Sequence, residues 1–109
     1  MAGEWIEFVN NLKDEAGTLA KSELVALITS LKGDSNEFVR KQTAKVERYL
    51  DQLARGEITK QDFERYVRQI ARLTEMESMK LSVAARASAR RITHAVEDLI
   101  LGRLLDLLL

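Results

Sequence analysis

The sequence predicts an all-α protein of three helices, in which an antiparallel hairpin is followed by a long C-terminal helix and the chains associate into an oligomeric helical bundle. Three observations predict this fold class. The 109 residues include no proline and only five glycines. Residue types that lose little free energy on entering a helix, such as Ala, Leu, Lys, Arg and Glu, are abundant. Apolar residues recur three and four positions apart, and no stretch shows the alternation typical of a half-buried strand. We treat residues 1–109 as one helical domain.

The first predicted helix covers residues 4–32. From Trp5 onward, apolar residues at three- and four-residue steps form one stripe along a helix. Gly17 interrupts the centre of this helix, at a cost of about 1 kcal/mol relative to alanine. We expect the large indole of Trp5 either to cap the bundle or to anchor a partner.

The second predicted helix covers residues 35–55 and ends in a well-marked turn. Gly56 follows a basic last turn, where a glycine can adopt the left-handed conformation that closes a helix. Thr59 lies three residues before Asp62, which approximates a capping box for the next helix. These signals predict that the first two helices pack as a hairpin and that a third begins near residue 60.

The third predicted helix covers residues 60–105, because nothing that regularly ends a helix occurs between Thr59 and Gly102. At about 1.5 Å per residue, it would form a rod of roughly 65 Å. A compact domain of this size has a radius of gyration of only about 13 Å. The helix therefore either bends at residues 74–82 or stays straight and pairs with another copy. We expect the straight helix, because sharp kinks usually occur at proline or glycine.

The C-terminal segment LILGRLLDLLL, residues 99–109, is apolar nearly all round a helix. Such a helix is normally buried on several sides. Upstream, small residues recur through residues 82–93 and would let a second backbone approach closely. Because two other helices are too few to cover both features, we expect a second subunit to cover them. The predicted protein interface comprises Ala85, Ala89, Val96, Leu99, Ile100, Leu104, Leu105, Leu107 and Leu108.

The sequence predicts no catalytic residue, no metal ligand and no cofactor. It contains no cysteine, and it has no glycine-rich phosphate loop, nucleophile elbow or metalloprotease motif. The single histidine, His94, has Glu97 and Asp98 on the same helical face, but one histidine with two acids is a weak set of metal ligands. We expect His94 to form an interhelical hydrogen bond or to lie in solvent beside a carboxylate.

Charge is balanced over the whole chain but not along it. Residues 1–37 carry three Lys and seven acids, a net charge of −4, and residues 38–72 carry nine basic and five acidic residues, a net charge of +4. Residues 73–109 carry five of each. Complementary segments favour pairing between helices over nucleic acid binding. The C-terminal segment is too short and too charged to cross a bilayer. We therefore expect a cytoplasmic protein that binds neither nucleic acid nor membrane.

These patterns predict a non-enzymatic assembly or adaptor protein. It would self-associate through the third helix and the leucine-rich C-terminus, with a dimer as the expected oligomer. A different protein is a second possible partner. An alternative comes from a different class. In that interpretation the same apolar segment lines a pocket, and the protein binds a lipid or another apolar ligand.

Overall fold

The structure is all-helical over the part of the chain that it describes. It is a computed structural model and describes residues 4–11 and 18–105. Within these ranges it has five α-helices, one π-helix and no strand. In chain order they are α1 (Glu4–Asn10), α2 (Thr18–Lys32), α3 (Glu37–Ala54), α4 (Lys60–Ser78), α5 (Val83–Thr93) and the π-helix η2 (His94–Leu104). The predicted all-α class is confirmed, and the predicted count of three helices is wrong.

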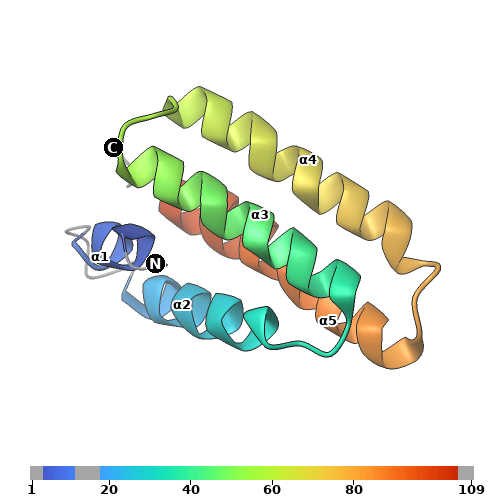
Figure 1. Ribbon diagram of the computed structural model, residues 1–109. Helices are drawn as coiled ribbons and strands as arrows, with labels where there is room; N and C mark the ends of the chain where they lie inside the picture. The colour runs from blue at the N-terminus through green and yellow to red at the C-terminus, as the bar shows by residue number, and fades with distance from the viewer. Residues whose placement is uncertain (1–3, 12–17, 106–109) are drawn as a thin grey trace.

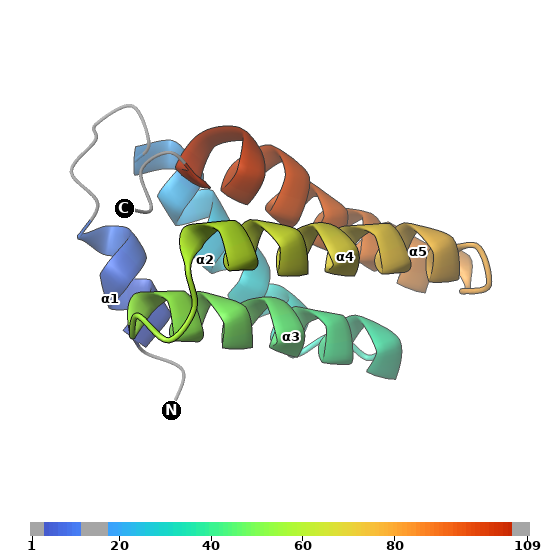
Figure 2. The same cartoon turned by 90° about the horizontal axis from the view of Figure 1, so that it is seen from above.

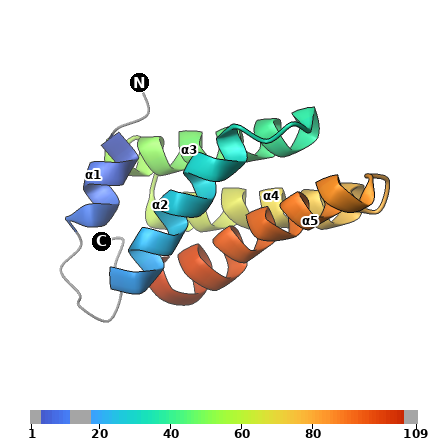
Figure 3. The same cartoon turned by 90° about the horizontal axis from the view of Figure 1, so that it is seen from below.

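The helices form a bundle in which α3, α4 and α5 run in alternating directions. α3 and α4 form one hairpin, and α4 and α5 form a second (Figure 1). η2 continues directly from α5, so the last segment runs back alongside α4. α2 lies across α3 and η2, on the side of the bundle opposite α4 (Figures 2 and 3). α1 packs against the C-terminal part of α3.

The predicted helix over residues 4–32 is two helices in the structure. α1 ends at Asn10 and α2 begins at Thr18, and the two run in different directions (Figure 2). Trp5 explains why α1 is separate. Its side chain is buried, its backbone N–H donates to Asp51 Oδ1 at 3.1 Å, and its indole N–H donates to Glu47 Oε2 at 2.8 Å. Trp5 therefore caps the end of the bundle. Gly17 lies outside the described residues.

The second helix and its turn agree closely with the prediction. α3 starts one residue after Asn36, whose side chain accepts a hydrogen bond from the backbone N–H of Val39 at 3.0 Å. Gly56 has a φ of 73°, the left-handed conformation that the turn requires. The hydroxyl of Thr59 accepts from the N–H of Asp62 at 3.0 Å, as a capping residue does. The prediction of a helix start at this position is confirmed.

The prediction of one continuous helix over residues 60–105 is wrong. α4 ends at Ser78, the chain reverses through residues 79–82, and α5 begins at Val83. The reversal needs neither glycine nor proline, because Ser82 caps α5 by accepting from the N–H of Ala85 at 3.2 Å. With the chain folded back, the radius of gyration is 13.2 Å, the value of a compact domain of this length.

The π-helix changes how the leucine-rich segment presents its side chains. In η2 the hydrogen bonds span five residues, as from the N–H of Leu105 to the carbonyl of Ile100. Side chains four and five positions apart therefore share a face. Gly102 fits this geometry, because a Cβ there would lie only 3.0 Å from the carbonyl oxygen of Glu97. Buried residues occur in pairs at this spacing, namely Ala95 and Val96, Leu99 and Ile100, and Leu104 and Leu105.

One main apolar core joins α1, α2, α3, α4 and η2. The indole of Trp5 closes one end of it, and η2 supplies its largest contribution of leucine and isoleucine. A smaller cluster of Leu31, Val39 and Ile92 joins α2, α3 and α5 at the other end of the bundle. The largest buried members of the main core are Trp5, Leu24, Ile28, Leu50, Phe63, Leu99, Ile100 and Leu104.

Candidate functional site

The residues predicted to form an interface with a second subunit lie inside the chain's own fold. Because the chain reverses after Ser78, α2, α3 and α4 contact α5, and α2 and α4 contact η2. Within the described residues, the same chain covers these side chains. Seven of the predicted residues are buried in this way: Ala85, Ala89, Val96, Leu99, Ile100, Leu104 and Leu105. The prediction for Leu107 and Leu108 falls outside the described residues.

The small residues of α5 also pack within the chain. α5 makes its most extensive contacts with α4, the helix that precedes it in the second hairpin. Ala89 lies at the edge of a hollow that α4 helps to form, and Ala85 lies beside the loop that connects α2 and α3. The predicted close approach of a second backbone therefore corresponds to a contact between neighbouring helices.

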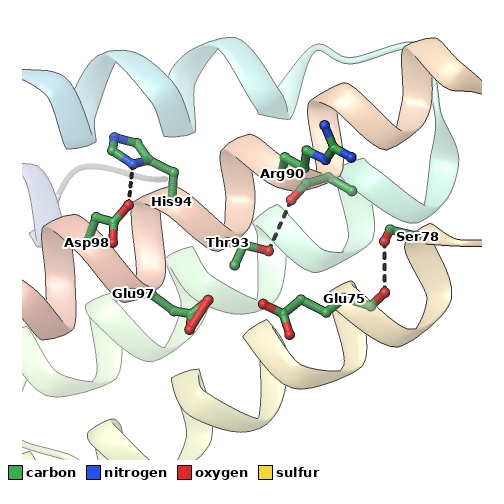
Figure 4. A pocket seen from close by; sticks show the side chains of 8 residues that line it. Glu75, Ser78, Arg90, Thr93, His94, Glu97 and Asp98 are labelled. Carbon is green, nitrogen blue, oxygen red and sulfur yellow. Dashed lines mark hydrogen bonds and ion pairs between the residues drawn. The ribbon is translucent and has the colours of Figure 1, made fainter.

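A polar hollow of about 380 Å³ opens between α4 and the junction of α5 with η2 (Figure 4). Side chains of opposite charge line it. α4 contributes Glu75 and Ser78, α5 contributes Ala89, Arg90 and Thr93, and η2 contributes His94, Glu97 and Asp98. Five of these side chains are titratable: Glu75, Arg90, His94, Glu97 and Asp98.

His94 is fixed between two carboxylates and links η2 to α2. Its Nδ1 lies 2.8 Å from Asp98 Oδ2, and its Nε2 lies 2.6 Å from Glu23 Oε2. A carboxylate accepts hydrogen bonds, so this position suits the protonated imidazole, which donates from both nitrogens. The hydrogen bonds to Glu23 and Asp98 accordingly raise the pKa of His94. The predicted interhelical hydrogen bond of His94 is confirmed.

Glu97 faces Glu75 across the hollow, from η2 to α4 (Figure 4). Burial raises the pKa of Glu97, and the charge of Glu75 and a hydrogen bond to it raise the pKa further. The two hydroxyl groups nearby donate to carbonyls of their own helices, Ser78 to Glu75 and Thr93 to Ala89. Neither hydroxyl is therefore paired with a base as an activated nucleophile would be.

The described residues offer no group of three His, Asp or Glu side chains placed to hold a metal ion. Each ring nitrogen of His94 already lies within hydrogen-bond distance of a carboxylate oxygen. The hollow is therefore best described as an electrostatic junction that ties η2 to α2 and α4.

The junction at His94 predicts a pH dependence of stability. A histidine whose pKa is raised by folding stabilises the fold fully below its unfolded pKa of about 6.5, and this contribution is lost as the pH rises through the folded value. We expect the free energy of unfolding of the native chain, relative to that of a His94→Gln variant, to fall as the pH rises above about 6.5. The effect is small, because all three side chains are at least 40% exposed.

Urea denaturation of both chains between about pH 5.5 and pH 9 measures this effect. Other groups also change the free energy of unfolding with pH: the pKa of Glu97 is raised, and that of Asp34 is lowered mainly by a hydrogen bond from the backbone of Asn36. Both chains contain these groups, so the difference between the chains removes their contributions. A difference between the two chains that does not change with pH would contradict the assignment of His94.

A different kind of candidate site lies where α4 turns into α5. The side chains of Met76, Met79 and Val83 are 62%, 79% and 82% exposed. We call these three residues the hairpin tip. Beside them, Lys80 Nζ lies 3.6 Å from Glu77 Oε2, so the neighbouring charges compensate each other. The sequence prediction missed this surface, because a straight helix over residues 60–105 has no tip.

None of the described helices has an apolar stretch long enough to cross a membrane. Comparisons of the chain with known protein families, with curated proteins and with solved structures find no match.

Proposed function

We propose that this chain is a non-enzymatic assembly or adaptor protein that self-associates through the hairpin tip. The observation that supports the proposal is the exposure of Met76, Met79 and Val83, which lie within eight residues of one another around the turn between α4 and α5. Exposed apolar clusters tend to mark contact surfaces, and methionine adapts its shape to what it contacts. The cytoplasm stays the location that we propose for the protein.

A second copy of the chain suits the tip as a partner. In a two-fold symmetric dimer each residue of the contact meets the same surface of the other copy, so a charged surface would repel itself. The tip is apolar, and the ion pair of Glu77 and Lys80 beside it has no net charge. Three side chains make a contact smaller than the roughly 1,200 Å² of a standard interface. The proposed dimer is therefore weak and depends on concentration.

The alternative function, binding of a lipid or another apolar ligand, has less support. Charged side chains line each of four hollows in the described part of the chain, as Lys45 and Arg48 do in one and Asp34 does in another. Sites for apolar ligands are lined mainly by apolar side chains. The apolar residues expected to line such a pocket, including Val96, belong to the packed core.

Light scattering over a dilution series tests the proposal. We expect the apparent mass of the native chain to rise above 12.4 kDa as the concentration increases, whereas a Met79→Lys/Val83→Lys variant stays at that mass. A Leu19→Lys/Ala26→Lys variant is the matched control, because it adds two lysines at exposed positions of α2. Native chain that stays monomeric throughout, or a tip variant that associates as the native chain does, would contradict the proposal.

A further inference from the structure

A groove lies on the outer surface between α3 and α4, apart from the polar hollow at His94. α3 and α4 lie side by side along this surface (Figures 1 and 2). The groove has a volume of about 290 Å³, enough for one or two large side chains. Its lining includes Lys45, Arg48 and Tyr49 from α3 and Tyr66, Ile70 and Leu73 from α4. The groove lies along the α3–α4 hairpin, whereas the hairpin tip belongs to the turn between α4 and α5.

The floor of the groove is apolar and fixed in place. The rings of Tyr49 and Tyr66 stack with their centroids 4.9 Å apart and 29° between their planes. Leu73 continues this surface along α4 and is 39% exposed. Beneath it, the buried Gln42 donates from Nε2 to the hydroxyl of Thr74 at 3.1 Å. This hydrogen bond joins the two helices, so the groove is formed before anything binds.

The rim of the groove is positively charged. Lys45 and Arg48 line it, and none of its lining residues is acidic. Three other cations of α3 and α4 have carboxylate partners: Lys41 with Glu37, Arg65 with Asp62, and Arg68 with Glu64. Within the described residues, Lys45 and Arg48 form no ion pair, and the guanidinium of Arg48 instead lies 5.2 Å from the centre of the Tyr49 ring. The rim therefore lacks a negative partner that a ligand could provide.

We propose that this groove binds an acidic, amphipathic helix of a partner protein. Its apolar stripe would lie on the surface formed by Tyr49, Tyr66 and Leu73, and carboxylates beside that stripe would pair with Lys45 and Arg48. An amphipathic helix in an apolar groove is a recurring mode of recognition, and complementary charges select the partner. The inference concerns a different surface from that of the proposed self-association and does not depend on it.

A second copy of the chain fits this groove poorly. A two-fold symmetric contact would place Lys45 and Arg48 of one copy against the same residues of the other, and like charges in a contact are unfavourable. Single-stranded nucleic acid is also disfavoured. Such ligands stack their bases on open aromatic faces, whereas Tyr49 and Tyr66 stack on each other.

Fluorescence anisotropy with a designed peptide tests the inference. The probe is a labelled helix of about 15 residues with leucine at three- and four-residue spacing and glutamate beside it. A matched peptide has lysine in place of every glutamate. We expect the native chain to bind the acidic peptide at least about tenfold more tightly than the basic one, with a preference that weakens as salt is raised to about 0.5 M. Equal binding of the two peptides would overturn the inference.

Charge reversal then locates the site. We expect a Lys45→Glu/Arg48→Glu variant to bind the acidic peptide at least about tenfold more weakly than the native chain does. The matched control, Lys41→Glu/Arg72→Glu, changes the same charge at exposed positions on the same two helices and should bind within about twofold of the native chain. Circular dichroism checks that both variants fold. An equal loss of affinity in both variants would mean that the overall charge of the chain attracts the peptide. That result would overturn the assignment of the site to this groove.

Two further measurements separate this inference from the proposed self-association. The Met79→Lys/Val83→Lys variant should bind the acidic peptide as the native chain does, and loss of binding there would move the site to the hairpin tip. NMR amide shifts on addition of the peptide should change along α3 and α4. A single-stranded RNA oligonucleotide that binds more tightly than the acidic peptide would overturn the inference in favour of nucleic acid.

Discussion

A chain shortened to end at Asp98 is expected to be unfolded, although it keeps α1 to α5 complete. The shortening removes four side chains of the main core: Leu99, Ile100, Leu104 and Leu105. Truncation of one such buried side chain to alanine costs about 2–5 kcal/mol. A domain of this size has a total free energy of unfolding of about 5–15 kcal/mol, so the loss of four exceeds what the fold can sustain. Far-UV circular dichroism and thermal melting measure the outcome.

A chain that ends at Leu105 is the matched control, because it keeps every buried residue that the structure describes. We expect it to unfold cooperatively, with a midpoint temperature close to that of the 109-residue chain. A cooperative transition in the chain that ends at Asp98 would contradict the placement of η2 in the core. Light scattering of the chain that ends at Leu105 also tests Leu107 and Leu108, whose part in self-association stays a prediction.

The substitution Trp5→Ala is expected to lower the free energy of unfolding by about 3–5 kcal/mol, the range for removal of a buried aromatic side chain. Trp5 is fully buried, and its indole N–H donates to Glu47 at 2.8 Å. Glu47 is itself buried and keeps only its contact with Lys32, at 3.1 Å, when the indole is removed. The substitution therefore costs both apolar contacts and the hydrogen bond of a buried carboxylate. Urea denaturation followed by circular dichroism measures the loss.

Trp5→Phe separates the two contributions. Phenylalanine keeps most of the apolar contact but cannot donate to Glu47, so we expect a smaller loss, of about 1–3 kcal/mol. A loss below about 1 kcal/mol for Trp5→Ala would mean that α1 does not close the end of the bundle. Equal losses for the two substitutions would mean that the hydrogen bond accounts for the whole effect.

The sequence was sufficient to predict the parts of the fold that depend on local chemistry. Residue composition predicts the all-α class, and the glycine and threonine of the turn after α3 predict where one helix ends and the next begins. Gly56 and Thr59 adopt the conformation and the hydrogen bond expected of them. His94 was likewise predictable as a hydrogen-bonding residue, because carboxylates follow it at helical spacing.

The reversal between α4 and α5 was not predicted, and the error in the third predicted helix follows from it. The local signal for this reversal is Ser82, whose hydroxyl accepts from the N–H of Ala85. Serine three residues before alanine also occurs inside helices, so the pair does not by itself predict a turn. Local chemistry does not decide between a continuous helix and a capped turn here. The decision comes from the core, because only the folded-back chain brings η2 against α2 and α4.

The candidate sites were also beyond the sequence prediction. An apolar segment contains no information on whether its own chain or another chain covers it, so Val96 and Leu99 were assigned to an interface. The exposed methionines of the hairpin tip lie within residues 74–82, where the sequence leaves both a bend and a straight helix open. The groove between α3 and α4 depends on which flanks of two helices meet, as in the stacking of Tyr49 on Tyr66.

The π-helix η2 has a consequence for how this chain can change by mutation. Its buried residues recur as pairs, four or five positions apart, whereas in an α-helix Leu104 would point about half a turn away from Ala95. Exchange of one apolar residue for another keeps every pair on the core side. Insertion or deletion of a single residue before Leu104 rotates Leu104 and Leu105 around the helix axis. One of these two leucines then points to solvent. The last segment of the bundle therefore tolerates changes of residue type far better than changes of length.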